Sequence, residues 1–427
     1  MRVLFLADRG WDGILDLALR AQALGHQVRV FLGKYDDVKH PLGKGLVKRV
    51  PDWRDSMRWA DLVILEGNTR YMGELDAWRR RGVPIVGGND ESASWEHNRE
   101  IGMRVLEEAG VPLVEHQVFR DYDQAIRYVE RRGEPSYCKP CSDTGNKALS
   151  AKTGVPEDPS WQLRRWKERL GRPSAPIMLQ DAIDGIEMGC AVWAGPAGFA
   201  AGIEENWEEK KLHAGDLGVN TGEVGSIQRY VARSKLFDKV LRPCEEAIER
   251  LGVVCNFSIN CIVDGDGTGW PLEWTVRCGW PSTNLEVELL DDPIEFLLAL
   301  ALGEDTRGMH KLDEFVVGVG LNLPPFPHPP PDYRDVIGIP IFCDDYSGFH
   351  ACEVMAGTDT PLATAGTAVA FITGNGEKVG EAQRQAYKRI EQISMPGSPF
   401  WRDDIAQRLR KELPRLQEHG FATDAEF

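Results

Sequence analysis

An acidic and a basic residue stand four positions apart in the stretch "LEWTVRCGW" (272–280). Glu273 lies near the end of an apolar segment and Arg277 follows it, while Asn260 lies in the apolar segment before the turn-rich "GDGTG". Mg²⁺ takes one or two protein oxygens and fills its other positions with phosphate and water, and Arg binds anions bidentately. The pattern predicts either a metal and anion site on a β-hairpin or a structural Glu–Arg pair.

Two stretches upstream of this hairpin contain residues that could bind a nucleotide. Lys139 ends the apolar segment "YCKP", and Lys147 lies in the polar loop after it. Two ammonium groups and the loop N–H groups can cover a triphosphate; the alternative is a surface hairpin with solvated lysines. Further on, "LQDAIDGIEM" offers Gln180, Asp181 and Glu187 to an adenine edge and to ribose hydroxyls.

A third stretch, "HAGDLGVNTGEVGS", is dense in glycine. Asp216, Asn220 and Thr221 are interleaved with Gly215, Gly218, Gly222 and Gly225. Glycine at this density indicates a loop whose backbone passes close to a ligand, with a merely flexible loop as the alternative. The chain shows no Ser/His/Asp or Cys/His pattern for nucleophilic catalysis. The "CKPC" stretch lacks a second zinc half-site, so its cysteines are expected to be buried free thiols.

Composition limits the class of protein. The chain has 427 residues, 42% hydrophobic and 27% charged, with a net charge of −16, which predicts a soluble protein of two to four domains. An acidic surface argues against binding duplex nucleic acid but permits a nucleotide in a local basic pocket. No signal peptide or membrane-spanning run is expected at the start or within the chain, so a cytoplasmic location without membrane contact is predicted.

The spacing of the apolar residues predicts the helices and strands on which these residues lie. Residues 1–95 alternate strand and helix, which predicts a doubly wound parallel sheet with ligand loops at "ADRGWDG" and "EGNTRYMG". Single helices are expected over 96–110 and 235–252, and a long loop is expected within 206–226. The proline-rich "LPPFPHPPPDYRD" predicts a boundary, after which short strands dominate around one helix, "GEAQRQAYKRIEQI".

The order of these signals resembles the ATP-grasp superfamily, and within it the phosphoribosylamine–glycine ligase family. "YCKPCSDTGNKALSAK" is similar to the family's lysine loop, "LQDAIDGIEMG" to its strand-end linker, and "KKLHAGDLGVNTGEVGS" to its Asn-Thr-Gly loop. "LEWTVRCGWPSTN" is similar to its Glu-x-x-x-Arg hairpin, and the stretch from "GFHACEV" to "FWRDDIA" to its C-terminal domain. The resemblance covers most of the chain.

The resemblance implies an α/β fold that is α+β in its central part. We expect an N-terminal doubly wound domain over 1–95, ATP-grasp subdomains over 96–190 and 191–325, and a β-rich C-terminal domain over 326–427. The implied ATP-binding residues are Arg99, Lys139, Lys147, Gln180, Asp181, Glu187 and Lys211. The implied Mg²⁺ ligands, with Mn²⁺ as an alternative metal, are Glu273 with Asn260 or Thr275. The implied substrate residues are Asp216, Asn220, Thr221, Gly222, Arg277 and Trp280, with Asp216 and Arg277 also in catalytic roles.

The implied activity is an ADP-forming carboxylate–amine ligase that activates glycine or another amino acid as an acyl phosphate. Departures fall on the acceptor half: the first two N-terminal loops differ, Thr275 replaces the family's metal-binding Asn, and Trp280 replaces an Asp. They predict an altered amine acceptor, such as a modified nucleotide or nucleobase, for example in viral DNA-precursor modification. A genuine phosphoribosylamine–glycine ligase and a nucleotide-binding protein without ligase activity are the alternatives. Small-molecule partners and a monomer or weak homodimer are expected.

Overall fold

The computed structural model describes residues 1–7, 13–33, 41–132, 136–141, 151–152 and 157–427. Lys147 and most of the first predicted ligand loop, 7–13, therefore lie outside the described residues. In the part that is described, no helix is long and apolar enough to cross a membrane.

The N-terminal part is a four-stranded parallel sheet in the order β2-β1-β3-β4. Strand β1 is buried on both faces, with Val3 through Ala7 fully covered, as a central parallel strand requires. This is the doubly wound arrangement predicted from the alternating pattern. Its elements are β1 (Arg2–Ala7), α1 (Ile14–Ala23), β2 (Gln27–Leu32), a 3-10 turn η1 (Arg54–Ser56), β3 (Leu62–Leu65), α2 (Met72–Arg79) and β4 (Ile85–Val86).

Two helices follow where one was predicted. α3 (Asp90–His97) and α4 (Arg99–Glu108) meet at Asn98, whose extended backbone breaks the helix. The Asn98 side chain accepts hydrogen bonds from the N–H groups of Glu100 and Ile101, so it caps α4. This break sets Arg99 at the first turn of a new helix.

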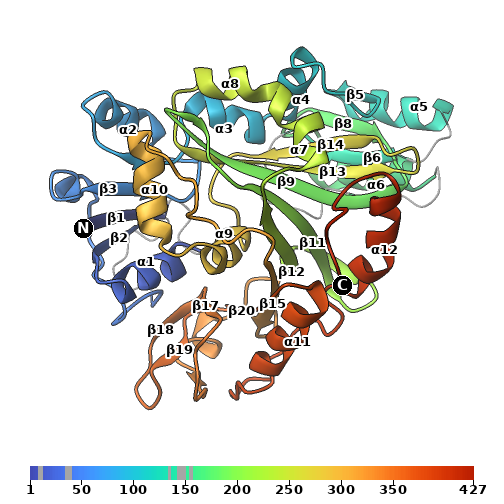
Figure 1. Ribbon diagram of the computed structural model, residues 1–427. Helices are drawn as coiled ribbons and strands as arrows, with labels where there is room; N and C mark the ends of the chain where they lie inside the picture. Colours follow the sequence, from blue (N-terminus) through green and yellow to red (C-terminus); the bar gives the residue numbers. More distant parts are fainter. Residues whose placement is uncertain (8–12, 34–40, 133–135, 142–150, 153–156) are drawn as a thin grey trace.

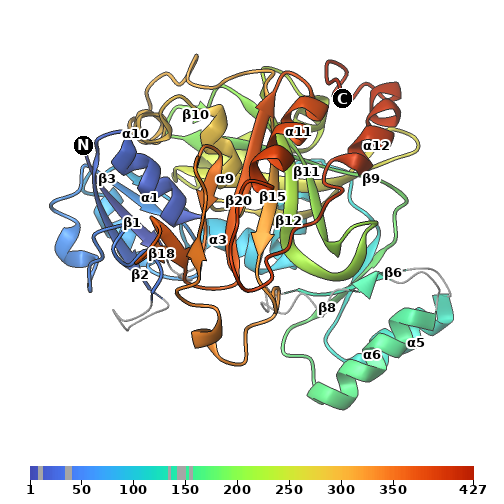
Figure 2. The same cartoon turned by 90° about the horizontal axis from the view of Figure 1, so that it is seen from below.

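A small antiparallel sheet comes next, in the order β5-β8-β6-β7. Two helices, α5 and α6, cover it, and Figure 2 shows this unit projecting from the body of the molecule. Its elements are β5 (His116–Phe119), α5 (Tyr122–Arg132), β6 (Ser136–Pro140), β7 (Ala151–Lys152), α6 (Glu157–Leu170) and β8 (Ile177–Asp181).

The centre of the molecule is a nine-stranded sheet, in the order β14-β13-β9-β11-β12-β15-β20-β17 with β10 paired to β9 (Figure 1). Its strands are β9 (Gly185–Gly195), β10 (Gly198–Phe199), β11 (Ile203–His213), β12 (Leu217–Val231), β13 (Cys255–Asp264), β14 (Gly269–Thr275), β15 (Phe315–Asn322), β17 (Phe349–Ala351) and β20 (Ala368–Gly376). The helical elements between them are α7 (Lys235–Val240), η3 (Arg242–Cys244), α8 (Glu245–Arg250), α9 (Ser282–Glu286), η4 (Val287–Leu289) and α10 (Pro293–Leu302).

The C-terminal part extends this sheet. β15 pairs with β20 across the proline-rich stretch, so one sheet runs through the predicted boundary at residues 325 and 326. The domain limits themselves stay predictions. The remaining elements are η5 (Tyr333–Asp335), β16 (Pro340–Ile341), β18 (Val354–Ala356), β19 (Leu362–Thr364), α11 (Val379–Ile390) and α12 (Gln407–Glu418).

Three further sequence-based expectations for elements were wrong. The glycine-dense stretch is not a long loop, because β11 and β12 form a hairpin through it that turns at Asp216. Residues 235–252 do not form one helix, because Pro243 interrupts it as the 3-10 turn η3. A second C-terminal helix, α12, was missed; it contains Pro414 and buries only Leu409, Leu413 and Leu416.

Candidate functional site

One face of the central sheet carries a row of polar side chains along β11. Alternate residues of a strand share a face, and Asn206 donates to Glu204 at 2.8 Å while Lys210 contacts Glu208 at 2.9 Å. Lys210 also contacts Glu187 of the neighbouring β9 at 2.6 Å. The surrounding carboxylates raise the pKa of Lys210 well above its ordinary value despite its burial, so this lysine is a fixed cation.

Glu273 lies beside this row, on β14. Its carboxylate accepts a hydrogen bond from Arg99 Nη2 at 2.5 Å. The Arg99 guanidinium, together with the ammonium groups of Lys139 and Lys210, holds the pKa of Glu273 well below its usual range. Four residues far apart in the sequence, at positions 99, 139, 210 and 273, therefore meet at one place.

The predicted partner of Glu273 is in register with it. Asn260 on β13 is paired with Glu273 on β14, and a bulge follows at once. The Asn260 amide donates to both carboxylate oxygens of Glu208 at 3.1 Å. Thr275, two residues after Glu273, pairs with Ser258 instead. Carboxylate and amide oxygens from three strands thus gather near Lys210.

Lys139 reaches the site from the small sheet. Its side chain is buried and lies 3.4 Å from Oε1 of Gln180, another buried residue. Burial, and then the nearby Arg99 cation, lower the pKa of Lys139 to about 8. The Gln180 amide nitrogen is buried and has no hydrogen-bond partner in the part of the chain that the structure describes. A buried ammonium beside an unpaired amide is an arrangement suited to an anionic ligand with hydrogen-bonding groups.

We call these eight residues the charged cluster: Arg99, Lys139, Gln180, Glu187, Glu208, Lys210, Asn260 and Glu273. Six of them were predicted from the sequence. Lys210 and Glu208 were not, although both lie in the stretch "NWEEKKLH" that supplied Lys211. The period of two along β11 would have identified them if the stretch had been read as a strand.

Several predicted residues lie elsewhere. Asp181 forms an ion pair with Arg132 at 2.6 Å, and Lys211 donates to the Gly218 carbonyl oxygen. Thr221 is buried and donates to the Lys210 carbonyl oxygen, which joins the two strands of the hairpin. Asn220 is exposed and Gly222 half-buried on β12.

The predicted pairing of Asp216 with Arg277 around one substrate does not appear in this structure. Asp216 lies at the tip of the β11–β12 hairpin and contacts Arg402 at 2.9 Å, where the C-terminal segment packs. Arg277 instead donates to Glu96 of α3 at 3.1 Å. The two residues therefore have separate ion-pair partners.

Trp280 follows Arg277 and packs edge-on against Phe371 of β20, with ring centroids 5.3 Å apart. It is partly buried against a small apolar cluster that includes Tyr230, Leu285 and Val316. Its indole nitrogen is buried and finds no hydrogen-bond partner within the described ranges. The ring is thus occupied on one side by Phe371.

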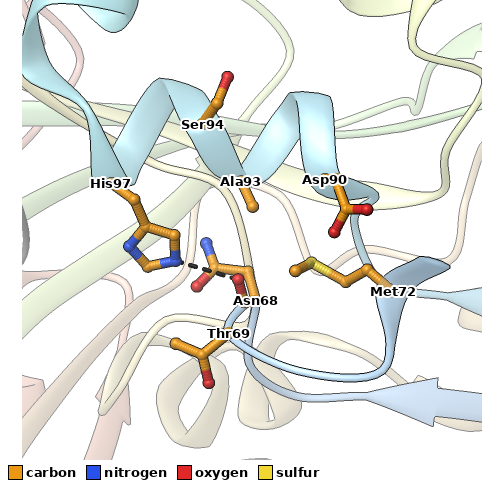
Figure 3. A pocket seen from close by; sticks show the side chains of 7 residues that line it. All are labelled: Asn68, Thr69, Met72, Asp90, Ala93, Ser94 and His97. Atoms are coloured by element: carbon orange, nitrogen blue, oxygen red, sulfur yellow. Dashed lines mark hydrogen bonds between the residues drawn. The ribbon is translucent and has the colours of Figure 1, made fainter.

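The structure also contains a pocket of about 370 Å³, which Figure 3 shows with the side chains that line it. It lies between α3 and the loop after β3, the loop predicted to hold the acceptor. The amide of Asn68 joins the pocket to the site, since it donates to Glu96 at 2.8 Å and to the Val276 carbonyl oxygen at 3.3 Å. The residues that line the pocket are Asn68, Thr69, Met72, Asp90, Ala93, Ser94 and His97.

The ligand atoms available near Glu273 are of the type that Mg²⁺ prefers. Hard cations prefer carboxylate and amide oxygens, and Glu273, Glu208 and Asn260 supply them. In the described residues, no group of three or more His, Cys, Asp or Glu side chains is arranged to hold a metal alone. A Mg²⁺ ion held here would take its other positions from ligand phosphates and water, as is usual for Mg²⁺.

Comparisons with known proteins give one consistent relationship. No family model matches the chain. A phosphoribosylamine–glycine ligase of Ralstonia nicotianae is 25% identical over 346 residues, which cover 79% of this chain and 81% of the relative.

Two solved structures place the fold. The crystal structure of phosphoribosylamine–glycine ligase from Thermotoga maritima matches with a TM-score of 0.74 at 19% identity, covering 95% of this chain and all of that one. The biotin carboxylase domain of a Hydrogenobacter thermophilus 2-oxoglutarate carboxylase, solved with MgADP and bicarbonate, matches with a TM-score of 0.63 at 13% identity, covering 94% of this chain and 91% of that one. The predicted fold class is confirmed.

Proposed function

Since this chain is a divergent ATP-grasp ligase related to the phosphoribosylamine–glycine ligases, we propose that it joins an amino acid to an altered amine acceptor at the expense of ATP. Glycine or another amino acid is activated as an acyl phosphate, and the acceptor amine then displaces the phosphate. ATP, the amino acid and the acceptor are the small-molecule partners.

The charged cluster is the observation that carries this proposal. Arg99, Lys139 and Lys210 place three cations around the Glu273 carboxylate. Phosphoryl transfer depends on positioning and on balancing the charge of the phosphoryl oxygens, which such cations do. Gln180 and Glu187 border the same place and suit the base and ribose of the nucleotide.

The same residues suit a metal–nucleotide complex. Glu273 with Glu208 or Asn260 would hold Mg²⁺, or Mn²⁺ in its place, and the bound metal would supply Lewis-acid stabilisation of the phosphates. Arg99 now holds Glu273 at 2.5 Å. Its guanidinium matches a phosphate as well as a carboxylate, so Arg99 is proposed to turn to the γ-phosphate when nucleotide binds.

The proposed reaction needs no side-chain nucleophile. A carboxylate oxygen of the amino acid attacks the γ-phosphorus and ADP leaves. The acceptor nitrogen then attacks the carbonyl carbon, the C–O bond to phosphate breaks, and the amine loses one proton. Arg277 is proposed to hold the amino-acid carboxylate, while the contact of Asp216 with Arg402 favours a structural role for Asp216.

The altered acceptor rests on the departures in the acceptor half. Thr275 and Trp280 replace the family's Asn and Asp, and the pocket beside Asn68 is formed by the rewritten "EGNTRYM" loop. A modified nucleotide or nucleobase, including a viral DNA precursor, is one class of acceptor. The packing of Phe371 against Trp280 leaves less of that ring for stacking on a base than the sequence suggested.

Two other functions remain to be separated from this one. A genuine phosphoribosylamine–glycine ligase would make the same acyl phosphate but accept phosphoribosylamine. A nucleotide-binding protein without ligase activity would bind ATP and make no acyl phosphate. The monomeric or weakly dimeric state, the absence of duplex nucleic-acid binding and the cytoplasmic location stay predictions.

The test uses hydroxylamine, which traps an acyl phosphate as a hydroxamate whatever the natural acceptor is. The protein is incubated with ATP, Mg²⁺ or Mn²⁺, hydroxylamine and each amino acid in turn, and hydroxamate and ADP are measured. We expect both products with one amino acid or a few. ATP binding without hydroxamate from any amino acid would contradict the proposal. Stimulation of ADP release by phosphoribosylamine, made in situ, would favour the genuine family enzyme.

A further inference from the structure

We propose that the pocket between α3 and the loop after β3 receives a cationic amine that carries no phosphate group. The inference rests on the proposed function for its chemistry, because it names the class of acceptor. It depends on the side chains of the pocket, not on the resemblance to other ligases.

Asn68 provides the first argument. Both donations of its amide nitrogen are used, one to Glu96 at 2.8 Å and one to the Val276 carbonyl oxygen at 3.3 Å. These contacts fix the orientation of the amide. Its oxygen is left fully buried and has no hydrogen-bond partner among the described residues. A buried acceptor without a partner is costly, so a ligand that donates a hydrogen bond here would be stabilised.

The other polar groups of the pocket are also acceptors. Asp90 contributes a carboxylate, and no ion pair to it is found in the described part of the chain. His97 lies 3.0 Å from the Asn68 carbonyl oxygen through Nε2, which then donates and leaves Nδ1 as an acceptor. Ser94 also lines the pocket, but its hydroxyl donates to the Glu91 carbonyl oxygen at 2.6 Å and points away from Asn68 and Met72 (Figure 3).

The described charges nearby disfavour a phosphate. No described residue that lines the pocket is a lysine or an arginine. Arg277, which is linked to Asn68 through Glu96, donates to Glu96 and to the Cys278 carbonyl oxygen. Arg70 donates to the Gly33 carbonyl oxygen at 3.1 Å. A phosphate monoester would meet the Asp90 carboxylate without a compensating cation, whereas an ammonium group would be attracted to it.

The apolar wall sets the shape of the ligand. Met72 and Ala93 are buried and face each other across the pocket (Figure 3). Asp90 lies at one end and Asn68 with His97 toward the other (Figure 3). An acceptor with two amine ends and a short carbon chain therefore fits: one ammonium meets Asp90, and the other end donates to Asn68 beside the Glu96–Arg277 pair.

The test is direct binding, measured by calorimetry on the full chain with 1,4-diaminobutane and with ribose 5-phosphate as probes. We expect the diamine to bind, and ribose 5-phosphate neither to bind nor to displace it. Asp90→Asn should weaken diamine binding about tenfold or more, the usual effect of losing one charged hydrogen bond. Glu91→Gln, an exposed acid in the same helical turn outside the pocket, is the matched control and should bind as the wild type does.

A second variant protects the test against a folding defect. Asp90 is exposed, so Asp90→Lys reverses the charge at the pocket and should abolish diamine binding while the thermal midpoint stays close to that of the wild type. Absence of diamine binding, unchanged binding by Asp90→Asn, or displacement by ribose 5-phosphate would overturn the inference. The hydroxamate assay needs no natural acceptor. If hydroxamate forms but the diamine does not bind, this inference is wrong and the proposed function stands. Diamine binding without hydroxamate overturns the proposed function alone.

Discussion

Lys210 and Lys211 are adjacent in the sequence, yet their ammonium groups lie at different places. Lys210 contacts Glu187 and Glu208 at 2.6 and 2.9 Å within the charged cluster. Lys211 donates to the Gly218 carbonyl oxygen at the exposed end of the hairpin, at 3.3 Å. The difference follows from the strand, because successive side chains of a strand point to opposite faces.

This pair of lysines gives a matched test of the site. Lys210→Met should lower the rate of hydroxamate formation at least 100-fold, since it removes a cation from the place where phosphate charge develops. Lys211→Met changes the same residue type at the next position and should keep the rate within about twofold. Equal losses in both variants would show that the charged cluster is not the site of phosphoryl transfer.

Glu273 is the proposed metal ligand, and its removal should change the metal requirement. Glu273→Ala should raise the Mg²⁺ concentration for half-maximal hydroxamate formation about tenfold or more, because one of few protein oxygens is lost. Thr275→Ala, two residues further along β14, should have a smaller effect, since a hydroxyl is a weaker ligand than a carboxylate. The measurement is a metal titration at saturating ATP, and full activity of Glu273→Ala would refute the assignment.

The lowered pKa of Lys139 should make ATP binding depend on pH. Its pKa of about 8 in the free protein is lowered by burial, and the charges of a bound triphosphate should raise it. Binding then takes up a proton above pH about 8, so the dissociation constant for ATP should increase up to tenfold per pH unit there and be flat below. Lys139→Met should bind ATP more weakly and lose this slope. A slope that survives in the variant would assign it to another group.

The residues of the charged cluster could be predicted from the sequence better than the order of the strands that carry them. Lys139 and Glu273 were found because each lies near the end of an apolar segment, where burial and a charged residue coincide, and Glu187 because it follows the strand end at Gln180 and Asp181. The pairing that unites them was not predictable, because β13 and β9 are separated by about sixty residues and their register is set by packing of the whole sheet.

The largest error fell on the β11–β12 hairpin. Its four glycines and polar residues hide the alternation that marks a strand. Gly225 is required by packing, because a Cβ there would lie 2.3 Å from the Ile405 side chain of the C-terminal segment. Asp216 was taken for a ligand group because it stands beside glycines, whereas its backbone, with φ of 56°, makes the turn and its carboxylate meets Arg402. A contact between residues 216 and 402 leaves no local sequence signal.

Asp216 should therefore affect stability and not substrate affinity. Its side chain is partly exposed, so Asp216→Asn is expected to cost only about 0.5–1 kcal/mol of the free energy of unfolding. The KM for the amino acid in the hydroxamate assay should stay within about twofold. Arg277→Lys should show the converse, a raised KM at nearly unchanged stability. A raised KM for Asp216→Asn would restore the pairing that the sequence suggested.

His350 contacts three parts of the chain. Its raised pKa should make the protein less stable at high pH. The buried ring contacts Asp16 of α1 at 2.8 Å, Glu288 of η4 at 3.3 Å and Thr373 of β20 at 3.0 Å. The two carboxylates outweigh burial and raise the pKa of His350 to about 9, from an ordinary value of 6.5. The protonated ring therefore stabilises the fold fully below pH about 6.5, and this contribution is lost as the pH rises through about 9.

The measurement compares thermal midpoints between pH about 6 and about 10 for the wild type, His350→Gln and His328→Gln. His328 is exposed and serves as the matched control. The shift of His350 from 6.5 to about 9 corresponds to roughly 3–4 kcal/mol at most, since one pKa unit is about 1.4 kcal/mol. His350→Gln should be less stable than the wild type at low pH and approach it at high pH, while His328→Gln follows the wild type throughout. A constant difference between His350→Gln and the wild type would show that the ring is neutral in the folded protein.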